Sequence, residues 1–396
     1  METLVLDAAG RAPLEEVARL RAKGPVTRVG LPGGVAAWAV TDLALLRPML
    51  VDPRISKDSH QHWTALVNGE ITREWPLFTW VTSRSMFNSY GAEHRRLRKV
   101  AARAFTARRT RAMRPRIEAA TTGALDRLAA AGADGVVVDL REQFAYPIPI
   151  EVICDLLGVP DGQRGDMRRY ADVLMDTSAT AEQALSTQVA LRALITQLVE
   201  AKREQPDEDL TSVLAAELPA AEAAGTAQLA LIAGHETTVN LLASAVRLLL
   251  THPHVLAAAR AGEVAWADVV DETLRVAPPV VYIPLRFAVE DLELGGVPIT
   301  KGDPIIAAFG APGRDPGLHD EPALFDPARR DRTHLAFGAG AHHCPGEPLA
   351  RLEAEIALPA LFDRFPGLRL ADPDADLGQV PGFVANGPVR LPAVLG

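Results

Sequence analysis

The stretch that decides the fold runs from residue 337 to residue 346 and reads Phe337-Gly338-Ala339-Gly340-Ala341-His342-His343-Cys344-Pro345-Gly346. Its glycines let the backbone adopt positive φ angles and approach a flat ligand closely. Cys344 stands just before the last long helix that the sequence predicts, about 348–365, where the helix dipole favours the thiolate over the thiol. A thiolate presented in this way is a suitable axial ligand for haem iron. The alternative is a glycine-rich turn around a buried cysteine.

The same ten residues resemble the cysteine-ligand loop of the cytochrome P450 family, which reads Phe-Gly-x-Gly-x-His-x-Cys-x-Gly, at every fixed position. The order and spacing of further motifs extend the resemblance over nearly the whole chain. It implies a haem b cofactor with Cys344 as the axial iron ligand and with Phe337, Gly338 and Gly346 against the haem. Pro345 departs from the family pattern, because a residue with a backbone N–H is more usual there.

The composition is typical of a globular protein. The chain has 396 residues, 48% hydrophobic and 23% charged, and its formal net charge of −9 argues against a nucleic-acid or anionic-membrane binder. Two cysteines exclude a disulfide scaffold and a cysteine-rich zinc site, and Cys154, in an apolar run, is interpreted as a small buried hydrophobe. We expect a cytoplasmic protein, because no signal segment is visible and no apolar run reaches the roughly 18–20 residues of a membrane helix.

Helical patterning dominates the chain, with a small β component. Apolar residues recur with a helical period over long stretches from residue 93 to residue 250. Strand-like pieces occur at 26–29 and 37–41 and again within 280–310. No repeat and no linker divides the sequence. It therefore predicts a mainly α fold with a small β part (α+β) in one domain, 1–396, and the resemblance implies the cytochrome P450 fold, a helical bundle around haem with short β-sheets.

A glycine and polar residues interrupt an apolar helix at 233–238, Ala-Gly-His-Glu-Thr-Thr. Glycine in a helix interior costs about 1 kcal/mol, so it usually has a packing or functional reason. A kink, or a helix start capped by the threonines, is the alternative. The segment resembles the oxygen-binding groove of P450 enzymes. This implies that Ala233 and Gly234 leave room for dioxygen, that Thr237 holds the water chain that protonates it, and that Glu236 relays protons from solvent.

Glu272 and Arg275 place opposite charges on one helix face, which alone is a common surface arrangement. They also resemble the Glu-x-x-Arg pair of the P450 family, about 70 residues before the cysteine. In that family a second arginine joins the pair. Arg329 is the candidate here, with Arg330 as the alternative, and the implied role is structural.

Four basic residues stand where the family places partners of the haem propionates. They are His94, Arg98, Arg286 and His342. His94 and Arg98 are four residues apart on one predicted helix, so both can reach one anionic group. The alternative for each is an exposed surface charge.

The substrate pocket is expected to be apolar, because apolar pockets with few polar groups favour hydrophobic ligands. The candidate lining residues are Trp80, Phe87, Leu229, Ala230, Val281, Ile283 and Phe383. The aromatic ones lie in a tryptophan-rich segment that corresponds by order to the family's loop over the substrate. Ordinary packing is the alternative for any one of them.

Residues 94–116 contain ten Lys or Arg and no acid. A solvated helix face is the plain interpretation. The resemblance implies that this helix runs along the cysteine side of the haem, where a basic patch could dock an acidic ferredoxin. Arg95, Arg96 and Arg103 are the residues whose reversal to glutamate should slow reduction. No flavin- or nicotinamide-binding motif is present, so electrons are expected from ferredoxin and a ferredoxin reductase.

The favoured interpretation is a monomeric monooxygenase that inserts one oxygen atom from O2 into a C–H bond or alkene of a hydrophobic molecule, such as a secondary metabolite, macrolide or steroid-like compound. Oxidative coupling of aromatic groups and peroxide-driven oxygenation are alternatives on the same haem. A P450-like binding module without catalysis is an alternative of another class. A cysteine hydrolase that uses Cys344 with His342 or His343 is a further one, and it predicts a protein without haem.

Overall fold

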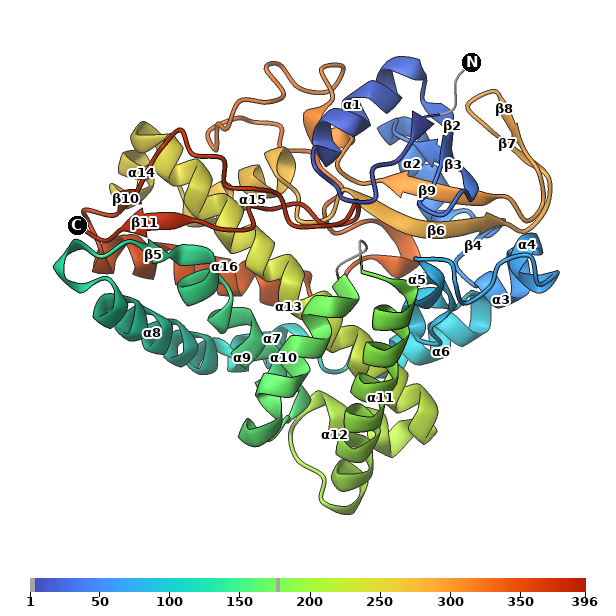
Figure 1. The fold of residues 1–396 in the computed structure, drawn as a ribbon, viewed down its shortest axis with the longest axis horizontal. Coiled ribbons are helices and arrows are strands. Elements are labelled where there is room, and N and C mark those ends of the chain that lie inside the picture. The colour runs from blue at the N-terminus through green and yellow to red at the C-terminus, as the bar shows by residue number, and fades with distance from the viewer. Residues whose placement is uncertain (1–3, 176–178) are drawn as a thin grey trace.

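A long buried helix forms the centre of the molecule. The computed structural model describes residues 4–175 and 179–396. Helix α13 (Ala220–Thr251) crosses the middle of the fold in Figure 1 and contacts helices that precede it and helices that follow it in the sequence. It is apolar on nearly every face because it is covered by protein on nearly every side.

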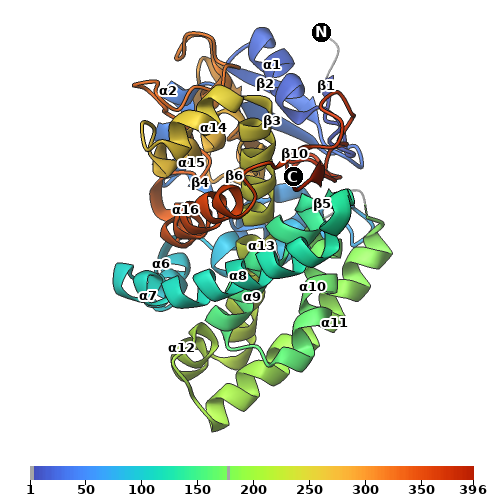
Figure 2. The ribbon, with the colours of Figure 1, turned by 90° about the vertical axis from the view of Figure 1, so that its left-hand side faces the viewer.

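The other helices lie around α13. They are α1 (Pro13–Lys23), α2 (Leu43–Val51), α3 (Ser59–His62), α4 (Thr64–Val67), α5 (Phe78–Thr82), α6 (Gly91–Ala101), α7 (Ala107–Ala112), α8 (Arg114–Ala131), α9 (Pro147–Leu157), α10 (Asp161–Met175), α11 (Ala181–Glu204), α12 (Leu210–Glu217), α14 (Pro253–Arg260), α15 (Trp266–Val276) and α16 (Glu347–Arg364). In Figure 1, α8–α12 lie in the lower half, α14 at the upper left, and α1–α6 on the right. Figure 2 shows α8, α9, α10 and α11 below the sheet region, with α16 above α8. The mainly helical fold class is confirmed.

The largest sheet has the strand order β1-β2-β3-β9-β6-β4. Its strands are β1 (Leu4–Val5), β2 (Val26–Gly30), β3 (Ala36–Val40), β4 (Ile55–Ser56), β6 (Tyr282–Ala288) and β9 (Pro304–Ala308). Strands β2 and β3 form the hairpin expected from the sequence, and β3 then pairs in parallel with β9. The pairing of β6 with β9 shifts register between Ile283 and Arg286, and this bulge changes which side chains face the helices.

Two small sheets complete the β component. One has the order β10-β11-β5, from β10 (Arg369–Leu370), β11 (Pro392–Val394) and β5 (Val138–Asp139), and joins the C-terminal tail to the segment before α9. The other is the hairpin of β7 (Leu292–Leu294) and β8 (Val297–Ile299).

Among the described residues, α13 is the one helix that is long and apolar enough to cross a membrane by length and composition. The sequence interpretation missed it, because charged residues divide the helix into shorter apolar runs. In the fold, 72% of its most apolar window is buried inside the protein. This burial is what the core helix of a folded bundle requires.

Candidate functional site

Cys344 lies in a tight loop that ends at the start of α16. Gly338 and Gly340 have φ angles of +70° and +72°, which an L side chain rarely adopts. The Cys344 N–H donates to the Phe337 carbonyl at 2.9 Å, and the N–H groups of Gly346 and Glu347 face the sulfur. The loop therefore fixes the direction in which the sulfur points.

Burial raises the pKa of the Cys344 thiol, and the Gly346 N–H and the Arg98 charge only partly oppose it. This differs from the expectation that the helix dipole favours the thiolate, because desolvation of the charged sulfur outweighs the dipole. A bound metal cation would reverse the balance, since a coordinating thiol is deprotonated.

The sulfur faces an internal cavity between the cysteine loop, α13 and the sheet. The walls come from elements far apart in the sequence and are mostly apolar. They include Met86, Phe87, Phe105, Ile153, Leu229, Ala230, Ala233, Gly234, Thr237, Pro279, Val280, Ile283, Phe309, Phe337, Cys344, Gly346 and Leu349. The structure thus brings the predicted loop residues and the predicted groove of α13 to opposite walls of one cavity.

Five basic side chains line the same cavity. They are the four predicted ones, His94, Arg98, Arg286 and His342, together with Lys57, which sequence reasoning missed. The rings of His94 and His342 lie with centroids 3.9 Å apart, and Arg98 Nη2 donates to the His343 carbonyl at 2.6 Å. Lys57 reaches this place only because β4 pairs with β6, so no local sequence pattern could have identified it.

These basic groups have no carboxylate partner within ion-pair distance in the described part of the chain. Arg286 is buried and its Nη1 has no hydrogen-bond partner there, and Lys57 Nζ has only the Pro284 carbonyl at 3.4 Å. Burial lowers the pKa of Arg286 to about 10, and burial with the Arg98 charge lowers the pKa of His94 to about 4. Buried charges are normally paired, so the cluster calls for an anionic ligand.

Glu353 is the one acid in the cavity wall, and it is not the missing counter-ion. Burial raises the pKa of its carboxyl well above the ordinary value, and its Oε2 has no hydrogen-bond partner in the described chain. This shift disfavours the charged carboxylate, so Glu353 is a poor counter-ion for the basic cluster.

Residues 233–238 lie within the continuous helix α13, so neither a kink nor a helix start occurs there. Thr237 lines the cavity, and its Oγ1 donates to the Ala233 carbonyl at 2.6 Å. A Cβ at Gly234 would stand 2.8 Å from Ile153 Cδ1, so close packing against α9 already requires this glycine.

Glu236 points away from the cavity that Thr237 lines. Successive residues of a helix differ in direction by about 100°, and Glu236 faces a second, polar cavity beside the π-helical turn η3 (Arg141–Ala145). Arg141 Nη2 lies 2.6 Å from Glu236 Oε1 and its Nη1 donates to Asn240. Burial raises the pKa of Glu236 although the Arg141 charge opposes it.

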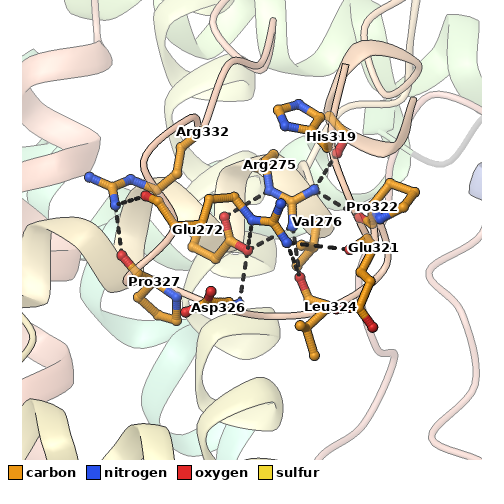
Figure 3. Close-up of polar contacts among 12 residues, drawn as sticks. Glu272, Arg275, Val276, His319, Glu321, Pro322, Leu324, Asp326, Pro327 and Arg332 are labelled. Atoms are coloured by element: carbon orange, nitrogen blue, oxygen red, sulfur yellow. Dashed lines mark hydrogen bonds and ion pairs between the residues drawn. The ribbon is translucent and has the colours of Figure 1, made fainter. Parts of the chain in front are cut away.

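Glu272 and Arg275 form a buried network with the loop before the cysteine (Figure 3). Both side chains are 0% exposed, and two hydrogen bonds of 2.7 Å join them. Arg275 also donates to the carbonyls of Gly313, Pro322 and Leu324. Arg329, and not Arg330, approaches Glu272, at 3.3 Å.

Four of the seven pocket candidates, Phe87, Leu229, Ala230 and Ile283, line the cavity. The other three do not. Val281 and Phe383 are fully buried in the core between the sheet and α1, and Trp80 packs against that core. Val280 and Ile283 line the cavity, whereas Val281 lies in the core on the other side.

The basic stretch is partly neutralised by neighbouring helices. Arg96 and Arg103, proposed as docking residues, pair with Glu222 and Glu217. Arg114 and Arg116 also have acidic partners, and Arg98 turns inward. Five basic side chains, Arg95, Lys99, Arg108, Arg109 and Arg111, have no ion pair within the described residues. Of the three expected docking residues, Arg96 and Arg103 are paired, and Arg95 has no ion pair among the described residues.

Within the described residues, no hydrogen bond joins the Cys344 sulfur to either neighbouring histidine. His343 Nε2 instead lies 3.0 Å from Glu347, and the His342 ring faces His94. A nucleophile needs a base within hydrogen-bond reach, so the geometry does not support a cysteine hydrolase.

The family model described as cytochrome P450 matches residues 266–374, which contain both the Glu272 network and the cysteine loop. A relative of 43% identity, the 2-hydroxy-5-methyl-1-naphthoate 7-hydroxylase of Streptomyces carzinostaticus, aligns over 98% of this chain and 97% of its own length. The cytochrome P450 monooxygenase PikC of Streptomyces venezuelae is 39% identical over 96% of this chain and 90% of its own.

Solved structures share the whole fold. CYP154A1 from Streptomyces coelicolor A3(2) superposes with a TM-score of 0.95 at 46% identity and covers 100% of both chains. CYP154C4 from Streptomyces sp. ATCC 11861, solved with a bound steroid, has a TM-score of 0.95 at 41% identity, covering 100% of this chain and 99% of its own. The similarity therefore extends well beyond the segment matched by the family model.

Proposed function

This chain belongs to the cytochrome P450 family and is a haem-dependent monooxygenase, and we propose that it oxygenates an apolar secondary metabolite at the cavity between Cys344 and Thr237. It uses O2, a hydrophobic substrate and a redox partner. The observation that carries the proposal is the joint presence, in one apolar cavity, of a buried thiol and a buried basic cluster without a counter-ion.

The residues of the cavity fit haem. Haem brings an iron that takes a thiolate ligand and two propionates that carry negative charge. The thiol of Cys344 and the unpaired cations Lys57, Arg98 and Arg286 supply the complementary groups, and the unpartnered Arg286 Nη1 is a donor without an acceptor until an anion binds. We assign Cys344 as the axial iron ligand and His94, Arg98, Arg286, His342 and Lys57 to the propionates.

The apolar part of the wall would hold the ring itself. Phe337, Gly346, Ala233 and Gly234 form this wall, and Gly338 follows Phe337 in the chain. Since α13, β6 and the cysteine loop all contribute to the one cavity, we propose a single domain over residues 1–396 that is centred on the cofactor.

When bound, haem supplies the activation of dioxygen and the insertion of one oxygen atom into the substrate. The chain supplies the protons. We propose that Glu236 takes up protons from the polar cavity beside Arg141 and that the Thr237 hydroxyl passes them, through water, into the substrate cavity. The Arg141 pair holds the Glu236 carboxyl on the polar side, so relay requires its rotation toward Thr237.

Replacing Thr237 with alanine tests this relay. The Thr237 hydroxyl belongs to the wall of the cavity that Cys344 also lines. Its loss should therefore lower the amount of product formed per electron consumed, by a factor between several-fold and about 10². The measurement compares NADH consumption, peroxide release and product. Full coupling in the variant would contradict the relay and favour oxidative coupling or peroxide-driven oxygenation.

The pocket wall indicates an apolar, polycyclic or macrocyclic substrate. Met86, Phe87, Leu229, Val280 and Ile283 offer no charge to the substrate side. Of the relatives named above, one is a naphthoate 7-hydroxylase and another is solved with a bound steroid, and both compounds are compact ring systems. Screening such compounds for the spin-state shift that follows displacement of iron-bound water identifies the substrate class.

We also propose that ferredoxin docks on α7 and the end of α6. Helix α7 packs against α16, and Phe105, just before it, lines the cavity beside Cys344. The unpaired arginines Arg108 and Arg111 are exposed there. A positive patch steers an acidic partner toward this face. The proposal includes a cytoplasmic monomer that works with ferredoxin and ferredoxin reductase.

Arg108→Glu and Arg111→Glu should each slow reduction by ferredoxin several-fold at low salt, and the difference should shrink as salt screens the charges. Arg260→Glu, on the distant helix α14, is the matched control with the same change of net charge. Stopped-flow reduction measures the rate. A salt-independent rate, or equal slowing in the control, would contradict docking at α7.

A further inference from the structure

Beside the polar cavity at Arg141 lies a set of metal-ligating side chains, of which the proposed relay uses only Glu236. The ligating atoms of Asp172 on α10 and of His235 and Glu236 on α13 all lie within 4.8 Å of one another. His235 is 0% exposed, and neither of its ring nitrogens has a hydrogen-bond partner in the described chain. Burying an imidazole without a hydrogen-bond partner costs free energy, and a ligand bound to its nitrogen lone pair would remove that cost.

We propose that Asp172, His235 and Glu236 bind a divalent zinc ion. One imidazole nitrogen and two carboxylate oxygens are ligands that zinc accepts, and the adjoining cavity can supply water as a fourth. Zinc bonds of about 2.0–2.2 Å place tetrahedral ligand atoms about 3.4 Å apart. Small side-chain rotations would therefore bring the three ligating atoms to bonding distance from one ion. Magnesium, which prefers oxygen ligands and retains its waters, does not suit this set.

The protonation state of the histidine suits a metal. Burial, with the charges of Arg168 and Arg141, lowers the pKa of His235 to about 3, so the imidazole is neutral at every working pH. Its ring packs edge-on against Tyr146, with centroids 4.4 Å apart, and the Tyr146 hydroxyl donates to Asp172. These contacts orient two of the ligands before any ion arrives.

The surrounding charge also favours a cation. Asp139, Glu142, Asp172 and Glu236 contribute four carboxylates to the cavity wall, against the guanidiniums of Arg141 and Arg168. Arg141 competes directly, because it holds one oxygen of Glu236. The site should therefore bind zinc more tightly when Arg141 is replaced by a neutral residue.

Zinc binding would have a consequence for turnover, and this part rests on the proposed relay. A zinc ion would fix the Glu236 carboxylate on the polar side of α13 and occupy the entrance from which it takes protons. Occupancy would then slow proton delivery without touching haem or substrate. The ion would act as an inhibitor of the monooxygenase.

The test titrates the haem-loaded protein with zinc sulfate by calorimetry and counts bound zinc after dialysis. We expect one zinc per chain, binding weakened by more than about tenfold in Asp172→Asn and in His235→Leu, and tightening of several-fold in Arg141→Gln. The matched control is His254→Gln, which removes an exposed histidine on α14 and should leave binding unchanged. Magnesium sulfate should not compete.

Binding that is unchanged in Asp172→Asn and His235→Leu, or lost in His254→Gln, would overturn the site. If the buried His235→Leu variant fails to fold, Asp172→Asn, which preserves shape, decides alone. Product formed per electron is measured with and without zinc as a separate readout. Site-specific binding with unchanged coupling would support the zinc site and contradict the relay role of Glu236.

Discussion

Replacing Cys344 with serine is expected to lower the oxygenation rate by roughly 10³-fold or more, because a hydroxyl would be a much weaker and less electron-donating ligand for haem iron than a thiolate. Among the described residues, Cys344 is the one cysteine that lines the cavity, beside the Met86 thioether and the Glu353 carboxyl. Haem content, the ferric absorption spectrum and turnover with a substrate found in the spin-state screen are the measurements.

Cys154→Ser is the matched control, since it makes the same chemical change in the other cysteine. Cys154 is fully buried in α9, and burial raises the pKa of its thiol to about 12, so it is an inert packing residue. The control should lose some stability and keep its spectrum and turnover. Equal turnover of Cys344→Ser and Cys154→Ser would contradict the assignment of the iron ligand.

Arg275→Met is expected to destabilise the fold by about 3–5 kcal/mol, because it leaves the Glu272 carboxylate buried without its main partner. Arg329, at 3.3 Å, cannot replace two hydrogen bonds of 2.7 Å, and three loop carbonyls also lose their donor. A loss of this size is a large part of the about 5–15 kcal/mol that stabilises a typical protein.

Urea unfolding and haem content measure the effect, with Arg114→Met as the control. Arg114 pairs with Glu118 on the exposed face of α8, where such a pair contributes about 0.5 kcal/mol at most. A variant Arg275→Met that unfolds at the same urea concentration as the control, with full haem content, would contradict the structural role of the network.

The parts of the fold that local patterns determine were predictable. The helices of the core follow a 3.6-residue apolar period, and the β2–β3 hairpin follows from two short strands around a Pro-Gly-Gly turn. The cysteine loop combines glycines that need positive φ angles with a helix start, so its residues were identified from the sequence together with the family resemblance.

The parts that depend on tertiary pairing were not predictable. Lys57 joins the basic cluster through the pairing of β4 with β6, and Val281 packs in the core beside α1 instead of lining the cavity. The partners of Arg96 and Arg103 lie more than a hundred residues along the chain. The protonated state of Cys344 depends on its burial, which no ten-residue motif contains.

Glu236 and Thr237 show how adjacency in sequence can mislead. The resemblance assigns them to one proton path, and the helix places them on two cavities, one polar and one apolar. Arg141 pairs with Glu236 on the polar side. It belongs to a π-helical turn that the apolar periodicity of the sequence did not predict. The relay and the zinc site both follow from that placement.

The absorption spectrum of the purified protein, reduced and saturated with carbon monoxide, tests the central claim most directly. If Cys344 presents its thiolate to haem in this cavity, the spectrum shows the strongly red-shifted Soret band that a thiolate-ligated haem gives. A haem-containing protein whose band lies at the unshifted position, or a folded protein that binds no haem, would contradict the account.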